Sequence, residues 1–307
     1  MLNKSKVFVV FVAVFCFLLS MCNQKKANNQ DEQTILKGKL SVLTDETLTP
    51  VVDDQIVIFE DRYDAHFEVK PKSESEIVND LLSQKYQVAF MARDLSDDEK
   101  NVFEQKKIHP RSTPFAIDAI ALIRNKTSND TLVALEDIVD FLNNSTTTIK
   151  GLVFDNPNSS TVRLLKEIAK VKDMPKDGVY SFKTNPEVVK FVAENEGMIG
   201  VVGVNWVSQP LPELIDYLDK IDVLSVKSIG GNHYYSPTQN DLAEGVYPLS
   251  RKLFLINCQG TTGLGMGLSS FVAGDVGQRI VLKSGLLPYN TPSRKVIIRN
   301  KIINDKK

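Results

Sequence analysis

The residues of this sequence that are best placed to bind an anion form one hydroxyl-rich run, Ser159-Ser160-Thr161. They follow the apolar run Leu152-Val153-Phe154 and open an amphipathic segment over residues 162–171. The pattern predicts a strand, a turn and the start of a helix. The first N–H groups of a helix lack intrahelical partners and carry the positive end of its dipole, so this turn favours an anion. The alternative is that Asn158 or Ser159 only caps the helix.

A second unusual residue is Asp118, because it interrupts the otherwise apolar run from Phe115 to Ile123. Such a run is typical of a strand that is buried on both faces. A carboxylate inside it is costly unless it meets a hydrogen-bond donor or takes up a proton. The alternative is that Asp118 lies at a strand edge and caps a neighbouring loop.

Other kinds of chemistry find little support in the sequence. The glycine-rich stretch at residues 260–265 lacks the Lys-Ser/Thr of a phosphate-binding loop, so we expect the glycines at 260, 263, 265 and 267 to serve close helix packing. The three histidines are far apart in sequence and the cysteines lack metal-ligand spacing. No Ser/His/Asp order stands in a convincing context. We therefore expect no enzyme, no metal and no cofactor.

The elements that must position these residues alternate between strands and helices in the first third of the chain. Apolar alternation and helical periodicity predict, in order, strand 39–43, helix 49–63, strand 66–69, helix 74–84, strand 88–91 and helix 96–106. This β-α order implies a parallel sheet with helices on its faces.

A second α/β stretch runs from Gly151 to about Val204. The later elements are expected at helix 185–195, strand 197–203, strand 222–226, strand 252–256 and helices 263–273 and 275–283. Because strand 252–256 needs a sheet to join, we expect the chain to return to its first lobe. Ligands collect at the carboxyl ends of strands in such folds, which is where loops 44–47, 92–94 and 158–161 are expected.

The composition gives no general electrostatic attraction for nucleic acid or for an anionic membrane. The 307 residues contain 37 Lys and Arg against 38 Asp and Glu, a net charge of −1, and 42% are hydrophobic. These values are ordinary for a globular protein and offer no general field for nucleic acid. Any anion must therefore be bound by local geometry.

The N-terminus has the features of an export signal. Lys4 and Lys6 precede an apolar run over residues 7–19 that is too short to span a bilayer. The following Leu19-Ser20-Met21-Cys22 resembles a bacterial lipoprotein signal, in which the Cys is lipidated, although Gly, Ala or Ser is usual at the position of Met21. We expect a signal peptide at 1–21, a lipid on Cys22 and a flexible tether at 22–37. The alternative is an uncleaved N-terminal membrane anchor.

Six ordered segments resemble the PstS-like family of periplasmic phosphate-binding proteins, the substrate-binding components of ABC phosphate importers. These segments are Thr44–Thr47, Met91–Leu95, Ala116–Ile123, Asp155–Thr161, Ile199–Gly203 and Tyr247–Lys252. The resemblance implies an α/β fold of two lobes, the type 2 periplasmic-binding-protein fold, with mixed, mostly parallel sheets. It places the binding domain at 38–300, with the first lobe at 38–125 plus 250–300 and the second lobe at 126–249.

The resemblance also implies which residues bind the ligand. It assigns the first-loop hydroxyl to Thr47, the proton-accepting carboxylate to Asp118, and the helix start to Ser159, Ser160 and Thr161. A carboxylate accepts a hydrogen bond from protonated phosphate and repels fully ionised sulfate.

Four positions depart from the family pattern. Asp155 stands where an Arg is expected, Ser160 and Ala119 stand for Gly, and Ala92 stands for Ser. Arg93 is the predicted replacement for the missing cation, since an Arg grips phosphate with two parallel hydrogen bonds. Arg163 is a further candidate, with a surface role as its alternative.

The expected function is therefore that of a lipid-anchored, palmitate-carrying protein of the periplasm or cell envelope. We expect a monomer that binds inorganic phosphate between its lobes and delivers it to an ABC permease complex, touching the membrane only through its lipid. The alternative is an oxyanion sensor or an envelope scaffold that takes no part in transport.

Overall fold

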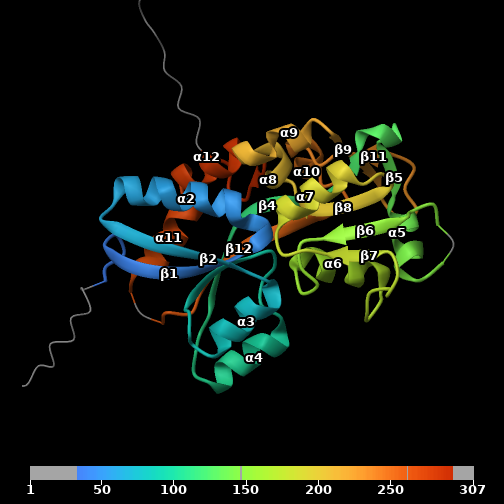
Figure 1. The fold of residues 1–307 in the computed structure, drawn as a ribbon. Coiled ribbons are helices and arrows are strands. Elements are labelled where there is room, and N and C mark those ends of the chain that lie inside the picture. The colour runs from blue at the N-terminus through green and yellow to red at the C-terminus, as the bar shows by residue number, and fades with distance from the viewer. Residues whose placement is uncertain (1–32, 146, 261, 293–307) are drawn as a thin grey trace, which may run out of the picture. The chain divides into compact units, whose positions relative to one another are not determined.

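One mixed sheet runs through the whole fold, with strand order β2-β1-β3-β12-β4-β8-β6-β7 (Figure 1). Strands β9 and β13 pair with β4 outside this path. The bounds are β1 Gly38–Asp45, β2 Ala65–Lys72, β3 Val88–Met91, β4 Arg111–Asn125, β6 Gly151–Phe154, β7 Val179–Ser181, β8 Met198–Gly203, β9 Ile221–Val223, β12 Ser250–Asn257 and β13 Leu287–Pro288.

The computed structural model describes residues 33–145, 147–260 and 262–292, which belong to one compact unit that begins at Gln33. The expected signal peptide, the lipidation of Cys22, most of the expected tether and the expected domain end at residue 300 lie outside the described residues. Within these ranges, none of the helices combines the length and the apolar character that crossing a bilayer requires.

The 15-residue strand β4 joins the two halves of the sheet. It pairs antiparallel with β12 on one side and with β8 on the other. Pairing is parallel farther out, between β1 and its neighbours β2 and β3 and between β6 and its neighbours β7 and β8. We call the part around β1–β3 and β12 the first lobe and the part around β6–β8 the second lobe. The predicted fold class is confirmed, with its antiparallel pairs concentrated at the centre.

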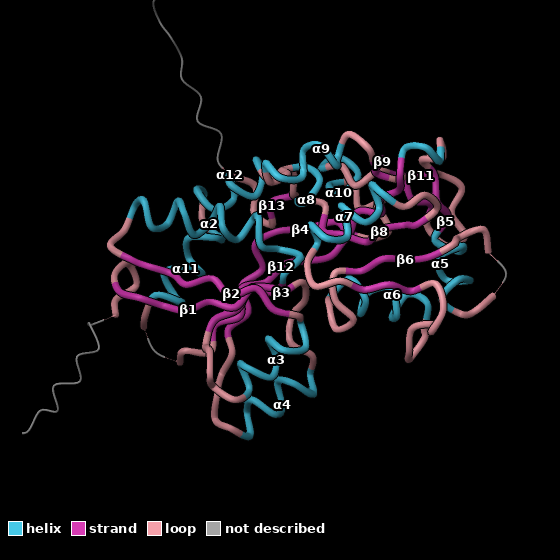
Figure 2. Tube along the Cα trace, viewed as in Figure 1, coloured by secondary structure: helices cyan, strands magenta, loops and turns pink. Residues whose placement is uncertain are grey.

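Helices cover the sheet of each lobe (Figure 2). In the first lobe, α2 and α12 lie on one side and α3 and α4 on the other (Figure 1). The helices are α2 Thr49–Arg62, α3 Glu74–Leu82, α4 Asp97–Gln105, α5 Leu135–Leu142, α6 Ser160–Ala169, α7 Asn185–Glu194, α8 Asn205–Ser208, α9 Ile215–Leu218, α10 Gln239–Ala243, α11 Leu264–Ala273 and α12 Asp275–Lys283.

Short elements complete the fold. They are the 3-10 helices η2 Glu46–Leu48, η3 Lys126–Ser128 and η4 Pro212–Leu214, and a second sheet of β5 Leu132–Ala134, β10 Ser225–Lys227 and β11 Tyr234–Tyr235. The sequence predicted one strand over residues 222–226, but the structure divides this region between β9 and β10, which belong to different sheets.

Local sequence signals explain where the helices near the expected site begin. Pro50 occupies the first turn of α2, where its missing N–H costs nothing. Ser73 and Ser96 each form a capping box with the glutamate three residues later, which starts α3 and α4. Both helices therefore start immediately after the loops that follow β2 and β3.

The first-lobe core is aromatic. Phe59 of α2 is fully buried and packs edge-on against Phe67 of β2 and Phe271 of α11. Phe90 of β3 packs in the same way against Phe115 of β4. These contacts fix α2 and α11 against the strands whose ends carry the site.

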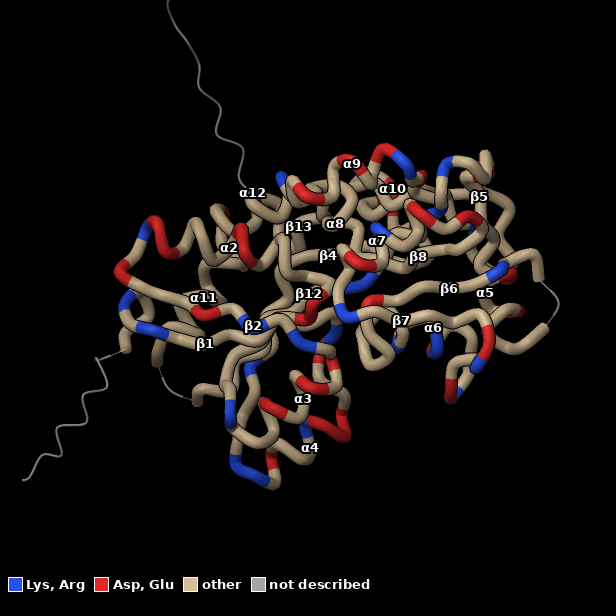
Figure 3. The backbone as a smooth tube through the Cα atoms, in the orientation of Figure 1, with Lys and Arg blue, Asp and Glu red and all other residues tan. Residues whose placement is uncertain are grey.

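Charges of both signs are interspersed along the chain (Figure 3).

Gly265 and Gly267 serve close packing, as predicted, whereas Gly260 has a φ of +69° and open space where a side chain would lie. A Cβ on Gly267 of α11 would lie 1.7 Å from the carbonyl oxygen of Ile35, and one on Gly265 would lie 2.5 Å from Oε1 of Gln259. The helix can approach the segment before β1 only because these positions carry no side chain.

Replacing Gly267 with Ala should therefore destabilise the protein by about 1–3 kcal/mol, because the added methyl group forces α11 away from residue 35. The matched control is Ser270→Ala, an exposed position one turn later on the same helix, which should stay within about 0.5 kcal/mol of the parent. Urea unfolding of the three proteins measures both values. Equal stability of the Gly267 variant and the parent would contradict the packing explanation.

Candidate functional site

The centre of the site is a buried guanidinium, that of Arg251 on β12. Only 6% of this residue is exposed. Its Nε and Nη2 donate to Oδ2 of Asp118 at 2.9 and 2.7 Å. Its Nη1 donates to Oγ of Ser160 at 2.7 Å, and its Nη2 also donates to Oγ1 of Thr47 at 2.8 Å. One cation thus joins a strand, a loop and a helix start.

The topology of the sheet brings these residues together. Arg251 and Asp118 are directly paired across the antiparallel strands β12 and β4. Thr47 lies in η2, which follows the carboxyl end of β1. Ser160 is the first residue of α6 in the second lobe, and its Oγ is 3.5 Å from Oγ1 of Thr47. The site is therefore built from both lobes.

The predicted hydroxyl-rich helix start is present at α6. Ser159 is the N-cap, and its Oγ accepts from the N–H of Val162 at 3.4 Å. It also lies 2.8 Å from Oγ1 of Thr161, which donates to Oδ1 of Asp155 at 3.0 Å. Ser159 therefore caps the helix, as the alternative interpretation expected. Ser160 and Thr161 are buried parts of the cluster.

Four carboxyl groups are clustered at the site. They are Asp45, Glu46, Asp118 and Asp155, and the three aspartates are at most 1% exposed. Asp45 accepts from the N–H and the hydroxyl of Thr47 through its Oδ1. One oxygen of each aspartate is buried without a hydrogen-bond partner among the described residues: Oδ2 of Asp45, Oδ1 of Asp118 and Oδ2 of Asp155. The site therefore contains carboxylate oxygens that can accept further hydrogen bonds.

Burial disfavours the ionised form of these carboxyl groups. Desolvation raises the pKa of Asp118 and of Asp45, although the charge of Arg251 works against it. Burial and the charge of Asp45 raise the pKa of Asp155 to about 6. Burial works to lower the pKa of Arg251, but the carboxylates of Asp118 and Asp45 outweigh it and raise that pKa. Near neutral pH the site therefore contains one fixed cation among carboxyl groups that ionise reluctantly.

Glu46 links the site to the second lobe. Its Oε1 accepts from the N–H of Asn185 at 3.0 Å, and its Oε2 accepts from Nδ2 of the same residue. Oδ1 of Asn185 in turn accepts from the N–H of Gly203 at 3.2 Å. Nearby, Nε1 of Trp206 donates to the carbonyl oxygen of Thr47 at 3.1 Å. These bonds fasten η2 of the first lobe to α7 and β8 of the second.

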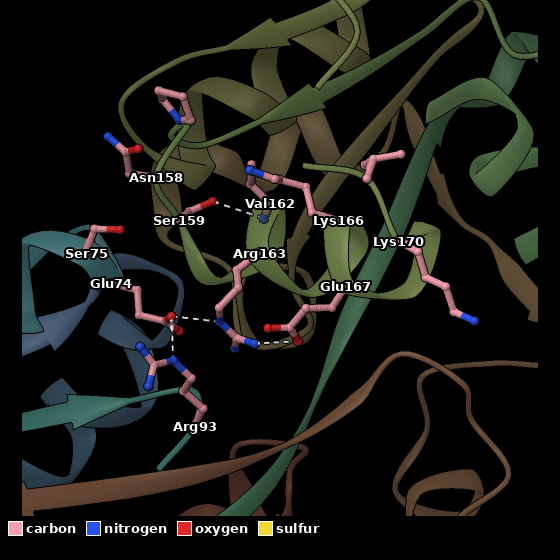
Figure 4. Close-up of a pocket in the computed structure, with 12 residues that line it drawn as sticks. Glu74, Ser75, Arg93, Asn158, Ser159, Val162, Arg163, Lys166, Glu167 and Lys170 are labelled. Atoms are coloured by element: carbon pink, nitrogen blue, oxygen red, sulfur yellow. Dashed lines mark hydrogen bonds and ion pairs between the residues drawn. The ribbon is translucent and has the colours of Figure 1, made fainter. Parts of the chain in front are cut away.

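Arg93, the cation predicted from sequence, does not join this cluster. Its Nε donates to Oε1 of Glu74 at 2.8 Å (Figure 4). Its Nη1 and Nη2 donate to Glu99 at 2.7 and 2.8 Å. Arg163 approaches the same oxygen of Glu74 from the second lobe, with its Nε at 2.7 Å. Glu74 is 3% exposed, so a buried carboxylate holds one Arg from each lobe.

The residue that the sequence reasoning missed is Arg251. It lies in the segment Tyr247–Lys252 that carried part of the family resemblance, but no role was assigned to it. The sequence contains a signal for this role. Arg251 alternates with the apolar residues Leu253 and Leu255, so it lies on the buried face of its strand. An arginine at an apolar position of a strand requires a buried anion, and Asp118 was already expected to need a donor.

An oxyanion at the Arg251 cluster must displace hydrogen bonds that are already formed. The guanidinium of Arg251 donates to Asp118, Ser160 and Thr47, and the hydroxyl of Thr47 donates to Asp45. The hydroxyl oxygens of Thr47 and Ser160 are 3.5 Å apart. Binding at this point therefore requires the lobes to separate or the guanidinium of Arg251 to shift. Among residues 33–145, 147–260 and 262–292 no group of side chains is suited to a metal ion.

Comparison with known proteins agrees with the fold. The family model described as PBP superfamily domain matches residues 27–276, so the resemblance drawn from the sequence is confirmed at the level of this family. No curated protein matches the sequence.

Several solved structures share the fold at low sequence identity. A Clostridium perfringens protein, described as a phosphate ABC transporter substrate-binding protein with bound phosphate, is 19% identical with a TM-score of 0.68, over 82% of this chain and 100% of its own. An ABC-type phosphate transport receptor from Vibrio cholerae is 13% identical with a TM-score of 0.61, over 82% and 100%. A variant of the OxyR2 regulatory domain from Vibrio vulnificus is 12% identical with a TM-score of 0.53, over 77% and 96%. At these identities the likeness concerns the fold.

Replacing Arg251 with Gln should destabilise the protein by about 3–5 kcal/mol, because it leaves buried carboxylates without their cation. Adding Asp118→Asn to this variant should recover part of the loss, since it removes the unpaired charge. Lys252→Gln, an exposed neighbour on the same strand, is the control and should change stability by less than about 0.5 kcal/mol. Denaturant unfolding would contradict this account if Arg251→Gln and Lys252→Gln behaved alike.

The stability of the protein should fall as the pH rises from 6 to 8. Burial, then the charge of Asp155, raises the pKa of Glu46 from 4.5 to about 8, so in this range the folded state holds a proton that the unfolded state has lost. The expected loss through this group is about 1–2 kcal/mol. Glu46→Gln, which cannot ionise, should make the pH profile flatter over this window. Denaturant unfolding at pH 6, 7 and 8 measures the slope; an unchanged slope in the variant would contradict the assignment.

Proposed function

The chain belongs to the family described as PBP superfamily domain, and we propose that it is a solute-binding protein that closes its two lobes around inorganic phosphate or a closely related oxyanion. In this proposal the protein releases its ligand to an ABC importer. The ligand lies where η2 and β12 of the first lobe meet the start of α6 in the second.

The observation that carries the proposal is the convergence on Arg251. A buried guanidinium, the hydroxyl of Thr47 and the hydroxyl of Ser160 come from three separate elements and meet within hydrogen-bond distance. Guanidinium groups, hydroxyls and the first N–H groups of a helix are the donors that phosphate oxygens prefer. When the lobes separate, these donors become available to an entering anion, and Arg251 takes the role that the sequence assigned to Arg93.

The surplus carboxyl groups support a protonated oxyanion as the ligand. A phosphate that keeps a proton can donate it to Asp118, whose Oδ1 has no partner among the described residues. Sulfate carries no proton near neutral pH and would meet only repulsion from the same oxygen. Asp45 and Asp155 extend this preference, because each also has an unpartnered buried oxygen.

Transport is supported by the predicted export signal and by the nature of the similar structures. The Vibrio cholerae neighbour is an ABC-type phosphate transport receptor. A lipid on Cys22 would hold the protein at the outer face of a membrane, where an importer takes up its substrate. In this proposal the protein acts as a monomer in the periplasm or cell envelope and contacts the membrane through its lipid alone.

A sensor or scaffold without transport is the second candidate. One observation favours it: the site contains four carboxyl groups and one guanidinium. A site that only binds anions would be expected to contain more cations than carboxyl groups. The regulatory OxyR2 domain shows that the fold also occurs outside transport. Phosphate uptake by cells that lack this protein separates the two: reduced uptake supports transport, and normal uptake supports the sensor.

Calorimetric titration of the full chain in detergent should show phosphate binding and no sulfate binding at neutral pH. Thr47→Val and Ser160→Ala should each weaken phosphate binding by about 1–3 kcal/mol, because each removes a hydrogen bond to a charged ligand. Thr127→Val removes a hydroxyl from η3, outside the cluster of Thr47, Ser160 and Arg251, and serves as the control. Failure of the parent to bind phosphate would refute the proposal.

Asp118→Asn should weaken the discrimination against sulfate, because an amide does not repel a fully ionised anion. The readout is the ratio of phosphate to sulfate affinity in the parent and the variant. An unchanged ratio would show that Asp118 does not select the ligand. Asp118 also pairs with Arg251, so the variant's fold is first checked by circular dichroism.

A further inference from the structure

A separate cavity of about 450 Å³ opens beside the site, between the lobes (Figure 4). Its first-lobe wall is formed by Glu74 and Ser75 at the start of α3 and by Arg93 after β3. Its second-lobe wall is formed by the turn before α6 and by one face of that helix. Two of the residues that the sequence predicted to bind the ligand, Arg93 and Ser159, line this cavity.

The lining of the cavity is basic. Arg163 and Lys166 lie one turn apart on α6, Lys170 is the residue that caps the end of this helix, and Arg93 faces them from the first lobe. The side chain of Lys170 extends away from Glu74 and Arg93 (Figure 4). The arginines are neutralised, because Glu74 binds both of them while Glu99 and Glu167 bind one each. No ion pair within the described chain involves Lys166 or Lys170. These two ammonium groups therefore provide an uncompensated positive charge.

The cavity borders the proposed phosphate site at one residue. Ser159 lines it, and the same hydroxyl lies 2.8 Å from that of Thr161 within the cluster. Ser160 and Lys166 are six residues apart on α6, which corresponds to about 9 Å along the helix axis. The side chain of Lys166 is flexible, so its ammonium group can approach the start of α6. A ligand with two anionic ends can therefore place one at the start of α6 and the other near Lys166.

The size of the cavity also points beyond a single tetrahedral anion. Pockets of roughly 300–1,000 Å³ usually hold small organic molecules. Glu74 adds an acceptor to the wall, since its Oε2 is buried without a partner among the described residues. A ligand hydroxyl is the neutral donor that complements such an oxygen.

We propose that this cavity is a second subsite and that the protein binds small phosphorylated acids, with the phosphoryl group at Arg251 and a carboxylate at Lys166. A hydroxyl between the two anionic groups faces Glu74. The inference rests on the proposed function, because it uses the same phosphoryl site, and it extends the ligand class from inorganic phosphate to phosphate monoesters with a second negative charge.

Two matched probes test the subsite by calorimetric titration of the full chain in detergent. 3-Phosphoglycerate has a phosphoryl group, a hydroxyl and a carboxylate, whereas glycerol 3-phosphate has a hydroxyl in place of the carboxylate. We expect 3-phosphoglycerate to bind about tenfold more tightly, the gain of one charge-assisted contact. In the double variant Lys166→Ala/Lys170→Ala the two affinities should become about equal. Lys172→Ala/Lys176→Ala, which changes two lysines outside the cavity, should keep the difference.

The outcomes separate this inference from the proposed function. Equal affinity for the two esters in the parent would overturn the subsite, as would a preference that survives in the Lys166/Lys170 variant. Binding of inorganic phosphate but of neither ester would overturn the subsite and leave the phosphate site intact. If none of the three ligands binds, both proposals fail.

Discussion

The buried ion pair between Arg251 and Asp118 is the interaction on which the rest of the site depends. It joins the two central strands of the sheet, and the same guanidinium reaches Thr47 in the first lobe and Ser160 in the second. Without it, several buried carboxyl groups would lack a cation, and an uncompensated buried charge costs several kcal/mol. An entering oxyanion must compete with these two hydroxyls for the N–H groups of Arg251. The same residue therefore supports the fold and limits how easily the site accepts a ligand.

The buried site and the neighbouring cavity differ in the sign of their charged residues. The interior of the site is acidic, with Asp45, Glu46, Asp118 and Asp155 around one guanidinium, while the neighbouring cavity is lined by Lys166, Lys170 and paired arginines. A basic entrance raises the local concentration of anions and speeds their association. The acidic interior then favours ligands that bring protons or hydroxyl groups. In the proposed function, selectivity arises from this arrangement and not from the overall charge, because the net charge of the chain is only −1.

Much of the fold was predictable because it follows local patterns. Helical periodicity located α2 and α7, and the apolar run around Asp118 identified the central strand β4. The partners of the charged side chains were not predictable in the same way, because they depend on how distant segments meet. Asp118 and Arg251 are 133 residues apart, so only the pairing of β4 with β12 reveals their contact. Arg93 was assigned to the ligand from its loop position, yet Glu99 lies only six residues away and binds it in the structure.

The most direct test of the account is the position of a bound oxyanion. Crystals of the full chain grown with arsenate, whose arsenic atom is located by its anomalous scattering, would show where the ligand lies. The account predicts one strong site within hydrogen-bond distance of Arg251, Thr47 and Ser160, with Asp118 facing a ligand oxygen. An arsenic site elsewhere, with the Arg251 cluster unchanged, would contradict it.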